Sequence, residues 1–500
     1  MNRKIIYCLL SILSIQSSLM LYAQSDSILP QKKRMMNFEE VIATARTQSP
    51  MAITARHQFR ASYWEYRSYR AGYLPNLSMS ATIPDLNRSI EKITTVDGDV
   101  FADRSQIGTM GSLQLSQNIP FTGGSIYMSS DLQRIDMLTD DGGTSYLTNP
   151  ISIGLRQPVN GYNSMKWEKL IEPLKYEEAK KDYINSLERV SLRAVSYFFD
   201  LALAQKNVEI SNQNFSNADT LYKIAKGRYQ LGTIAENELM QMELSSLNAG
   251  KELNEAHIDL AIRKFQLNSF LGFSQDEDVA LQIPLNIPEV NVILEKALEC
   301  ARKNNPDVLS RERQLLEARQ AVALSKANKG LNADIFASFG LSQRGEEFDG
   351  LYVRPEQQER IRLGVEIPIM DWGLARGKYK MAQSSQEVVK TNVAQAEMDF
   401  EQEVLLQVMQ FNLQDDQLRI AAKADTIARM RYEVTKQRFL IGKISVLDLN
   451  VALQEKDVAT RAYISALRNY WNYFFNMRSL TLFDWINNQS LSEEFDTLIK

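Results

Sequence analysis

An internal duplication limits what this chain can fold into more than any other feature of its sequence. Residues 162–279 and 372–478 each predict a long helix, a tight reversal at a glycine and a second helix that runs back. The reversal glycines, Gly232 and Gly442, lie 210 residues apart. The same offset relates Tyr222 to Tyr432, Leu239 to Leu449 and Pro158 to Pro368. A shared offset over that distance indicates duplication, so the fold must contain two similar parts.

Both copies contain stretches that favour very long helices. Glycine and proline, the residues that most readily end a helix, are absent from 174–226 and from 378–441. Apolar residues recur there at spacings of three and four, as at Leu187, Val190 and Ala194, which predicts packing along one side of each helix. A helix of about 70 residues would be roughly 100 Å long. We therefore expect helices packed against helices rather than a compact globule.

Six segments show the alternation of apolar and polar residues that is typical of strands. In the first of them, Leu77, Met79 and Ala81 alternate with serines. Each segment has about ten residues, the length that a tilted strand needs to cross a bilayer. The segments are 74–83, 111–119, 124–133, 150–158, 332–342 and 359–368. The stretches 84–109, 134–149 and 343–358 are rich in Asp, Gly and Glu, and we expect them to be loops on the outer side.

The duplication extends to the region before the strands and predicts the domain boundaries. Pro50 matches Pro306 at an offset of 256, which exceeds 210 by 46 residues, so the first copy carries an added strand pair around Gly123. The predicted parts are a first repeat at 24–279, a linker at 280–300, a second repeat at 301–478 and a tail at 479–500. We expect the acidic last dozen residues to be loosely held.

The N-terminus has the layout of a secretory signal peptide. Arg3 and Lys4 precede an apolar run, and the small residue Ala23 precedes the expected cleavage point, so residues 1–23 are predicted to be removed. Cys8 lies inside the apolar run without the small-residue approach of a lipoprotein site, so lipidation is not expected. Removal of residues 1–23 leaves Cys300 as the only cysteine, which excludes an intramolecular disulfide.

Composition and motifs exclude several classes of protein. Without Arg3 and Lys4 the 57 basic residues fall to 55 against 61 acidic ones, which gives no reason to expect nucleic acid. The sequence has no phosphate-binding loop, no Gly-x-Ser-x-Gly elbow, no His-Glu-x-x-His motif and no cluster of His or Cys for a metal. We therefore predict that the protein is not an enzyme and uses no cofactor. A carboxylate-based hydrolase is the remaining enzyme alternative.

The strands limit how the chain can assemble. A sheet with a lipid-compatible face must close on itself, because an open edge in hydrocarbon leaves backbone amides unpaired. Four to six strands cannot enclose a channel, since even eight leave little more than packed side chains. Several copies must contribute, and a threefold assembly would give twelve or eighteen strands around a polar lumen. The predicted fold class is α+β, a trimeric β-barrel continued by a long antiparallel α-helical barrel.

Over nearly all of its mature length, the chain resembles the outer-membrane efflux channels, of which TolC is the best-known member. The resemblance rests on the duplicated strand pairs and helical hairpins, on the Arg-aromatic-x-x-Gly reversals, and on Pro158 and Pro368 where strands give way to helices. It implies a homotrimer with its barrel in the outer membrane and its helices in the periplasm. It also implies docking to a periplasmic adaptor protein and to an inner-membrane pump of the RND, ABC or MFS type. The implied function is passive conduction of substrates to the cell exterior in a tripartite efflux or type I secretion system.

The resemblance implies a gate at the periplasmic end. Its first carboxylate corresponds to Asp448, six residues after the reversal glycine, and Glu238 is the counterpart in the first repeat. Three copies of Asp448 near a threefold axis would repel one another and favour cations. Lys443 is the candidate basic partner. The chain departs from the family pattern at Val451, Ile444 and Phe439, the positions of the second carboxylate, the latching Arg and the Tyr.

Other residues are candidates for docking and for the lumen. The tip candidates are Arg228, Gly232, Thr233, Arg438, Gly442 and Ser445, and the lumen candidates are Arg156, Arg360, Arg362 and Glu366. Simpler roles are open for several of them. Asp448 follows Ser445 at capping-box spacing, the glycines can end helices, and the tip arginines suit the helix dipole. The main alternative function is a secreted periplasmic coiled-coil adaptor or scaffold without a pore, which would not require six alternating segments.

Overall fold

The structure, a computed structural model, describes residues 34–499 except 97, 139–141, 160, 275–276, 285–286, 289, 442 and 445. The predicted signal peptide lies outside the described residues. The chain divides into two compact units. We call residues 34–50, 190–287 and 418–469 the hairpin unit, and residues 51–189, 288–417 and 470–499 the sheet unit. Both sequence repeats contribute to both units, so the units do not coincide with the repeats.

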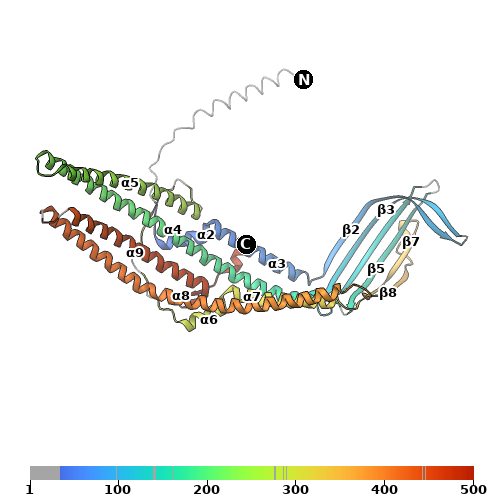
Figure 1. Cartoon of the computed structure of the whole chain (residues 1–500). Helices are drawn as coiled ribbons and strands as arrows, with labels where there is room; N and C mark the ends of the chain where they lie inside the picture. Colours follow the sequence, from blue (N-terminus) through green and yellow to red (C-terminus); the bar gives the residue numbers. More distant parts are fainter. Residues whose placement is uncertain are drawn as a thin grey trace, which may run out of the picture. The chain divides into compact units, whose positions relative to one another are not determined.

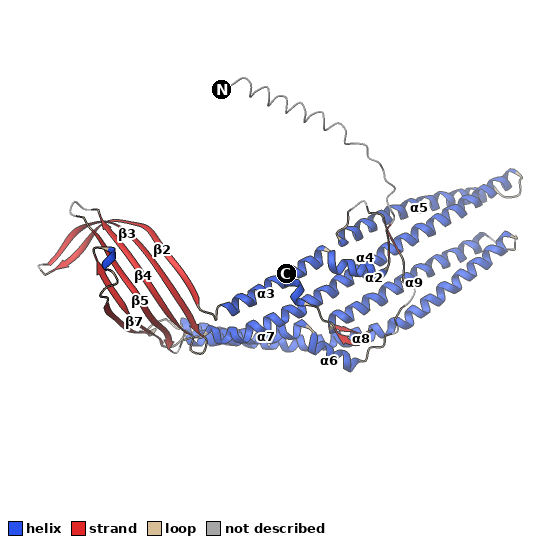
Figure 2. Cartoon of the chain, turned by 180° about the vertical axis from the view of Figure 1, so that it is seen from behind, coloured by secondary structure: helices blue, strands red, loops and turns tan. Residues whose placement is uncertain are grey.

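The sheet unit contains an antiparallel sheet of six strands in the described part of the chain (Figure 1, Figure 2). The strands are β2 (Asn76–Thr95), β3 (Gly98–Ile119), β4 (Gly124–Met137), β5 (Thr144–Val159), β7 (Asn332–Gly345) and β8 (Glu356–Glu366). Their order is β2-β3-β4-β5-β7-β8, so β2 and β8 form the edges. The predicted α+β class and the strands of the added pair are confirmed.

The prediction of a loop at 84–109 is wrong. Strand β2 continues to Thr95 and β3 begins at Gly98, and the two strands pair as far as these residues. Cross-strand polar contacts stabilise this outer part of the hairpin, as where Arg104 lies 2.8 Å from Glu91. Polar residues occur on both faces of this part of the hairpin. The sequence therefore lacks the clear apolar alternation that predicts a strand, and it favours a loop instead. The predicted loops at 134–149 and 343–358 are also shorter than expected, because the flanking strands extend into them.

Four helices repeat the duplicated layout with equal lengths. Helices α4 (Ser164–Gln230) and α8 (Leu374–Leu440) have 67 residues each, and α5 (Glu236–Leu271) and α9 (Val446–Thr481) have 36 each. Helices α4 and α5 run side by side, as do α8 and α9 (Figure 1). The predicted apolar stripes are buried, and Phe198 is fully covered. The prediction of two long helical hairpins is therefore confirmed. In the described part of the chain, no helix is long and apolar enough to cross a membrane.

Shorter helices complete the sheet unit. They are α3 (Pro50–Ala71), α6 (Leu294–Asn304), α7 (Pro306–Ala327) and α10 (Phe495–Ile499). The expectation of a loosely held C-terminal end is wrong for α10. The Phe495 ring lies 5.1 Å from that of Phe59, and Nε of Arg60 donates to the carbonyl of Leu498 at 2.5 Å. One aromatic residue within an acidic stretch is enough to anchor the chain end.

The hairpin unit also contains the start of the described chain. Strand β1 (Arg34–Met36) pairs in parallel with β6 (Val279–Leu281), which lies at the beginning of the predicted linker. Helix α2 (Phe38–Gln48) follows, and a capping box formed by Asn37 and Glu40 begins it. The ring of Phe38 lies 5.2 Å from that of Phe198 on α4. This contact fixes the entering chain on the helical core.

Candidate functional site

The tip of the first hairpin is a Schellman motif. The N–H of Thr233 donates to the carbonyl of Arg228 at 3.0 Å, and the N–H of Gly232 donates to the carbonyl of Tyr229 at 2.9 Å. Gly232 has a φ of 68°, in the left-handed region that favours glycine. The Thr233 hydroxyl donates a further bond to the Arg228 carbonyl at 2.8 Å. Helix α4 therefore ends in backbone geometry that requires this glycine.

The tip of the second hairpin contains the same backbone bond. The N–H of Lys443 donates to the carbonyl of Arg438 at 3.0 Å, and these two positions correspond to Thr233 and Arg228 at the offset of 210. The predicted tip residues Gly442 and Ser445 lie outside the described residues. The duplication thus extends to the hydrogen bonding of the turns. Helix termination, the simpler interpretation of the two glycines, accounts for this geometry.

The predicted gate residues lie at or next to the starts of the returning helices. Glu238 is exposed in the first turn of α5, and Asp448 is exposed in the first turn of α9. Lys443 is also exposed. Phe439 is half-buried and packs against the cluster of Tyr432, Leu449 and Ala452 within its own hairpin. Phe439 therefore has a packing role, and the gate assignment stays a prediction.

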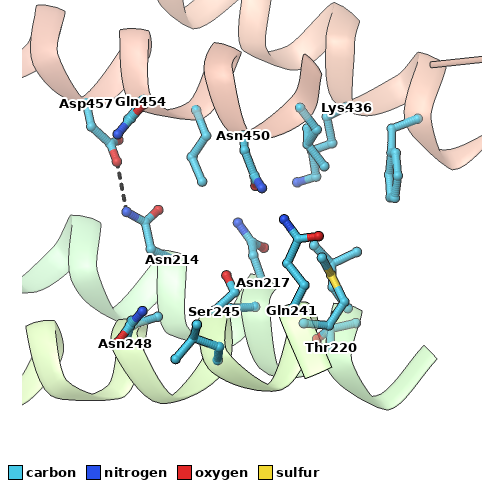
Figure 3. Close-up of a pocket in the computed structure, with 18 of the residues that line it drawn as sticks. Asn214, Asn217, Thr220, Gln241, Ser245, Asn248, Lys436, Asn450, Gln454 and Asp457 are labelled. Carbon is cyan, nitrogen blue, oxygen red and sulfur yellow. Dashed lines mark hydrogen bonds between the residues drawn. The ribbon is translucent and has the colours of Figure 1, made fainter. Parts of the chain in front are cut away.

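A polar seam joins the two hairpins inside the hairpin unit. Nδ2 of Asn214 on α4 donates to Oδ2 of Asp457 on α9 at 2.8 Å (Figure 3). Nδ2 of Asn217 donates to the hydroxyl of Tyr432 on α8 at 3.3 Å. Burial raises the pKa of Tyr432 above its usual value, although the bond from Asn217 opposes that shift. The hairpins therefore meet through amide and carboxylate contacts as well as through apolar packing.

A pocket of about 600 Å³ lies along this seam. In Figure 3 its walls come from both hairpins and include several amide side chains. The labelled lining residues are Asn214, Asn217, Thr220, Gln241, Ser245, Asn248, Lys436, Asn450, Gln454 and Asp457. In the described part of the chain, no group of three or more His, Cys, Asp or Glu side chains could hold a metal ion. The pocket can hold water or polar groups against its amides.

Sequence reasoning missed the seam, and it also missed a polar contact inside the second hairpin for which one signal was present. Positions Val404, Phe411, Leu418, Asp425 and Tyr432 recur every seven residues along α8, and all five are buried. Asp425 interrupts this apolar stripe with a carboxylate. It accepts a hydrogen bond from the hydroxyl of Thr460 on α9 at 2.6 Å and pairs with Arg429 at 2.9 Å. A charged residue in a heptad stripe predicts a polar contact inside a helical pair.

The two faces of the sheet differ in chemistry. Pairing places Arg156, Phe336 and Arg362 in one row across β5, β7 and β8. Arg360 lies two residues away on the same face, and Glu366 follows at the end of β8. Alternate residues of a strand point to opposite faces, so all four predicted lumen residues share one face. The structure thus brings together the residues that the sequence assigned to a lumen.

The opposite face of the sheet is apolar and uncovered. Ile361 is 83% exposed, Leu363 65%, Val365 53% and Phe339 53%. A soluble protein rarely leaves so continuous an apolar surface open to water. This face is therefore suited to contact with lipid or with another apolar surface.

Comparisons with known proteins identify the fold. Residues 297–481 match the family model described as outer membrane efflux protein. The resemblance to outer-membrane efflux channels is confirmed. The CmeC outer membrane channel of Campylobacter jejuni matches with a TM-score of 0.66 and 15% identity, over 92% of this chain and 88% of that chain. The outer membrane protein VceC of Vibrio cholerae gives 0.63 and 13%, over 89% and 95%. None of the curated proteins is significantly similar in sequence.

An open channel also has this fold. The MtrE outer membrane channel of Neisseria gonorrhoeae, in its open state, matches with a TM-score of 0.51 and 16% identity, over 89% of this chain and 88% of that chain. The family match supports the predicted function, an outer-membrane channel of an efflux system. The alternative, a coiled-coil adaptor without a pore, is not favoured. The efflux-channel family is one of channels and not of enzymes.

Proposed function

We propose that three copies of this chain close their sheets into one barrel in the outer membrane, which passively conducts substrates delivered from the inner membrane. The observation that carries the proposal is the sheet itself. Within the described chain, β2 and β8 each have a neighbour on one side alone. In hydrocarbon both edges need partners, and a copy on each side supplies them. Three sets of six strands give eighteen, enough for a water-filled lumen.

The two sheet faces suit such a barrel. The apolar face, which includes Leu363 and Val365, would contact lipid, and the polar face would line the lumen with Arg156, Arg360, Arg362 and Glu366. The Arg guanidinium groups would make this face hydrophilic.

The helices would continue the barrel wall in the periplasm. Helix α8 carries an exposed apolar stripe of heptad spacing at Leu406, Leu413, Ile420, Ile427 and Val434. Helix α5 carries another, at Met240, Leu244 and Leu247. Such stripes are typical of helices that pack against further helices. In a trimer these stripes would meet the helices of neighbouring copies.

The hairpin tips would dock to a periplasmic adaptor protein, which links the channel to an inner-membrane pump. Arg228 and Arg438 are exposed at the two tips, and Gly232 and Thr233 form the Schellman turn of the first. Gly442 and Ser445 complete the proposed docking set, and Asp448, Glu238 and Lys443 form the proposed gate. The carboxylates of Asp448 and Glu238 would favour cations at the proposed gate.

Outer-membrane fractionation tests the proposal directly. We expect the mature chain to purify in detergent as a heat-modifiable trimer and to give single-channel currents in planar bilayers. A water-soluble monomer without conductance would contradict the proposal.

Charge removal at the tips tests the gate separately. Asp448→Ala and Lys443→Ala should each change the closed-state conductance and the cation preference. Glu397→Ala, which removes an exposed carboxylate elsewhere on α8, is the matched control and should leave both unchanged. If Asp448→Ala also changes nothing, the gate assignment is wrong even though the channel conducts.

A further inference from the structure

The polar face of the sheet has a concentration of uncompensated positive charge. Arg156 and Arg362 flank Phe336 in one row, and Arg360 lies in the next row towards the outer ends of the strands. All three arginines are exposed. In the part of the chain that the structure describes, none of their guanidinium groups forms an ion pair. These exposed guanidinium groups are therefore available to a ligand.

Aromatic rings lie beside these arginines on the same face. The Tyr127 ring lies across Gly154, where an added Cβ would come within 2.2 Å of its Cζ atom. The Tyr127 and Phe336 rings are stacked, with centroids 6.2 Å apart and an interplanar angle of 27°. The Arg362 guanidinium lies 5.4 Å from the Phe336 centroid. The adjacent strands β4, β5, β7 and β8 thus carry two aromatic rings with arginine side chains beside them. We call this set, Tyr127, Phe336, Arg156, Arg360 and Arg362, the platform.

Carboxylates on this face lie on both sides of the platform. Towards the helical end, Asp334 is two residues from Phe336 along β7, and Glu366 is four residues from Arg362 along β8. At about 3.4 Å per residue, these separations are roughly 7 Å and 14 Å along the strands. On the outer side, Ser152 and Gln358 form a neutral row, and Asp131 on β4 and Glu356 on β8 lie beyond it. The platform is therefore separated from the outer carboxylates by a row of neutral residues.

We infer that this platform is a binding subsite for amphipathic anions, molecules with a flat apolar body and a carboxylate or sulfonate group. A guanidinium matches the two oxygens of such a group with parallel hydrogen bonds. The stacked rings offer an apolar surface to the flat body. The inference rests on the proposed function, because the platform faces the lumen of the barrel. A threefold assembly would place nine guanidinium groups in two adjacent rows around that lumen.

The subsite is opposite in sign to the proposed gate carboxylates. Asp448 and Glu238 lie in the first turns of α9 and α5, so the channel would contain both a cation-favouring gate and an anion-binding subsite. A subsite of this kind holds a substrate weakly at one stage of its passage and lets it leave.

Reversal potentials of purified trimers in planar bilayers test the charge. In a KCl gradient, the triple variant Arg156→Gln, Arg360→Gln, Arg362→Gln should lower the chloride-to-potassium permeability ratio by about threefold or more. Glu359→Gln is the matched control. It removes one charge from the same strand, on the opposite face beside Phe339 and Ile361, and should leave the ratio unchanged.

Block by 2-naphthalenesulfonate tests the binding site. We expect half-block of the wild-type channel at a concentration about tenfold lower than in the triple Gln variant, since paired charge-assisted hydrogen bonds are lost. Tyr127→Leu with Phe336→Leu should weaken block and leave the reversal potential unchanged. Lysine at all three arginine positions should preserve the reversal potential but weaken block. Each variant must first run as a heat-modifiable trimer.

The outcomes separate this inference from the proposed function. A conducting wild-type channel whose Gln variant has the same reversal potential and the same block would overturn the inference alone. Wild-type trimers without any conductance would overturn the proposed function and the inference with it.

Discussion

Asn214 and Asp457 join the two helical hairpins through a hydrogen bond of 2.8 Å between Nδ2 and Oδ2. Asp457 is 4% exposed, and its other oxygen lies 3.3 Å from Nζ of Lys456. A buried carboxylate at a helix interface stabilises one arrangement of the helices as long as its donors remain. Removal of this hydrogen bond should therefore weaken the contact between the two hairpins.

We predict that Asn214→Ala loosens the hairpins. The variant removes the amide donor to a buried carboxylate, at a cost of about 1 to 3 kcal/mol. The expected result is a lower dissociation temperature of the trimer and a larger conductance of the closed channel. Gln241→Ala is the control, since it removes an exposed amide from the same pocket wall. Equal effects of the two substitutions would show that the Asn214–Asp457 bond has no special role.

A buried ion pair in the sheet unit should dominate stability. Arg478 on α9 donates to both oxygens of Glu188 on α4, at 2.9 and 3.2 Å, and the Glu188 side chain is fully buried. Glu188→Ala should destabilise the fold by about 3 to 5 kcal/mol, nearer the lower value because Asp484 remains 3.4 Å from Arg478. Differential scanning calorimetry in detergent would measure the change.

An exposed ion pair provides the control for that prediction. Arg302 and Glu401 form an ion pair with side chains 60% and 50% exposed. Glu401→Ala should change stability by less than about 1 kcal/mol, because solvent screens the charges. A loss as large as that of Glu188→Ala would mean that burial does not decide the strength of these pairs.

Most of the fold could be predicted from the sequence because its patterns are periodic. Glycine and proline lie near the ends of the helices, and apolar alternation marks the inner part of each strand. The outer end of β2 and β3 could not be predicted, since Glu91 and Arg104 stabilise it through a cross-strand pair that has no periodic signal. Likewise, Phe495 anchors the C-terminus by a contact with Phe59, far away in the sequence.

The candidate site was predictable only where the family pattern or strand parity applied. Apolar alternation assigns Arg156 and Arg362 to the polar side of their own strands. The pairing register shows that they share one face of the sheet and that Phe336 lies between them. The Asn214–Asp457 contact breaks the symmetry of the repeat, because the position matching Asp457 in the first hairpin is Leu247. A duplication argument cannot find contacts that one copy alone has acquired.

Asp182 predicts a pH dependence of stability. The Asp182 residue is exposed, but neighbouring atoms of the sheet unit displace part of the water around its carboxyl and raise the pKa above the usual value. Glu178 and Asp307 add to that shift against the effect of Arg189. A folded-state pKa above the unfolded one means that the charged form destabilises the fold. Asp182→Asn should therefore raise the dissociation temperature of the trimer at pH 8. The advantage should vanish as the pH falls below about 4, the ordinary pKa of an aspartate, where wild-type Asp182 is neutral in both states. A constant difference between the two proteins at all pH values would contradict this assignment.

Gly232 allows the tip geometry to be tested without altering any side-chain contact. An added Cβ would meet nothing within 4 Å, so Gly232→Ala changes only the cost of a φ of 68°. That cost is about 1 to 2 kcal/mol, enough to distort the Schellman turn or to pull the chain out of the left-handed region. We expect less adaptor protein to co-purify after crosslinking and a matching loss of efflux in cells. Gly227→Ala is the matched control: it also has open space around its Cβ but lies inside α4, where alanine favours the helix. The proposed docking role of the tip requires that Gly232→Ala reduce co-purification while Gly227→Ala does not, and equal recovery of the adaptor with both variants would rule it out.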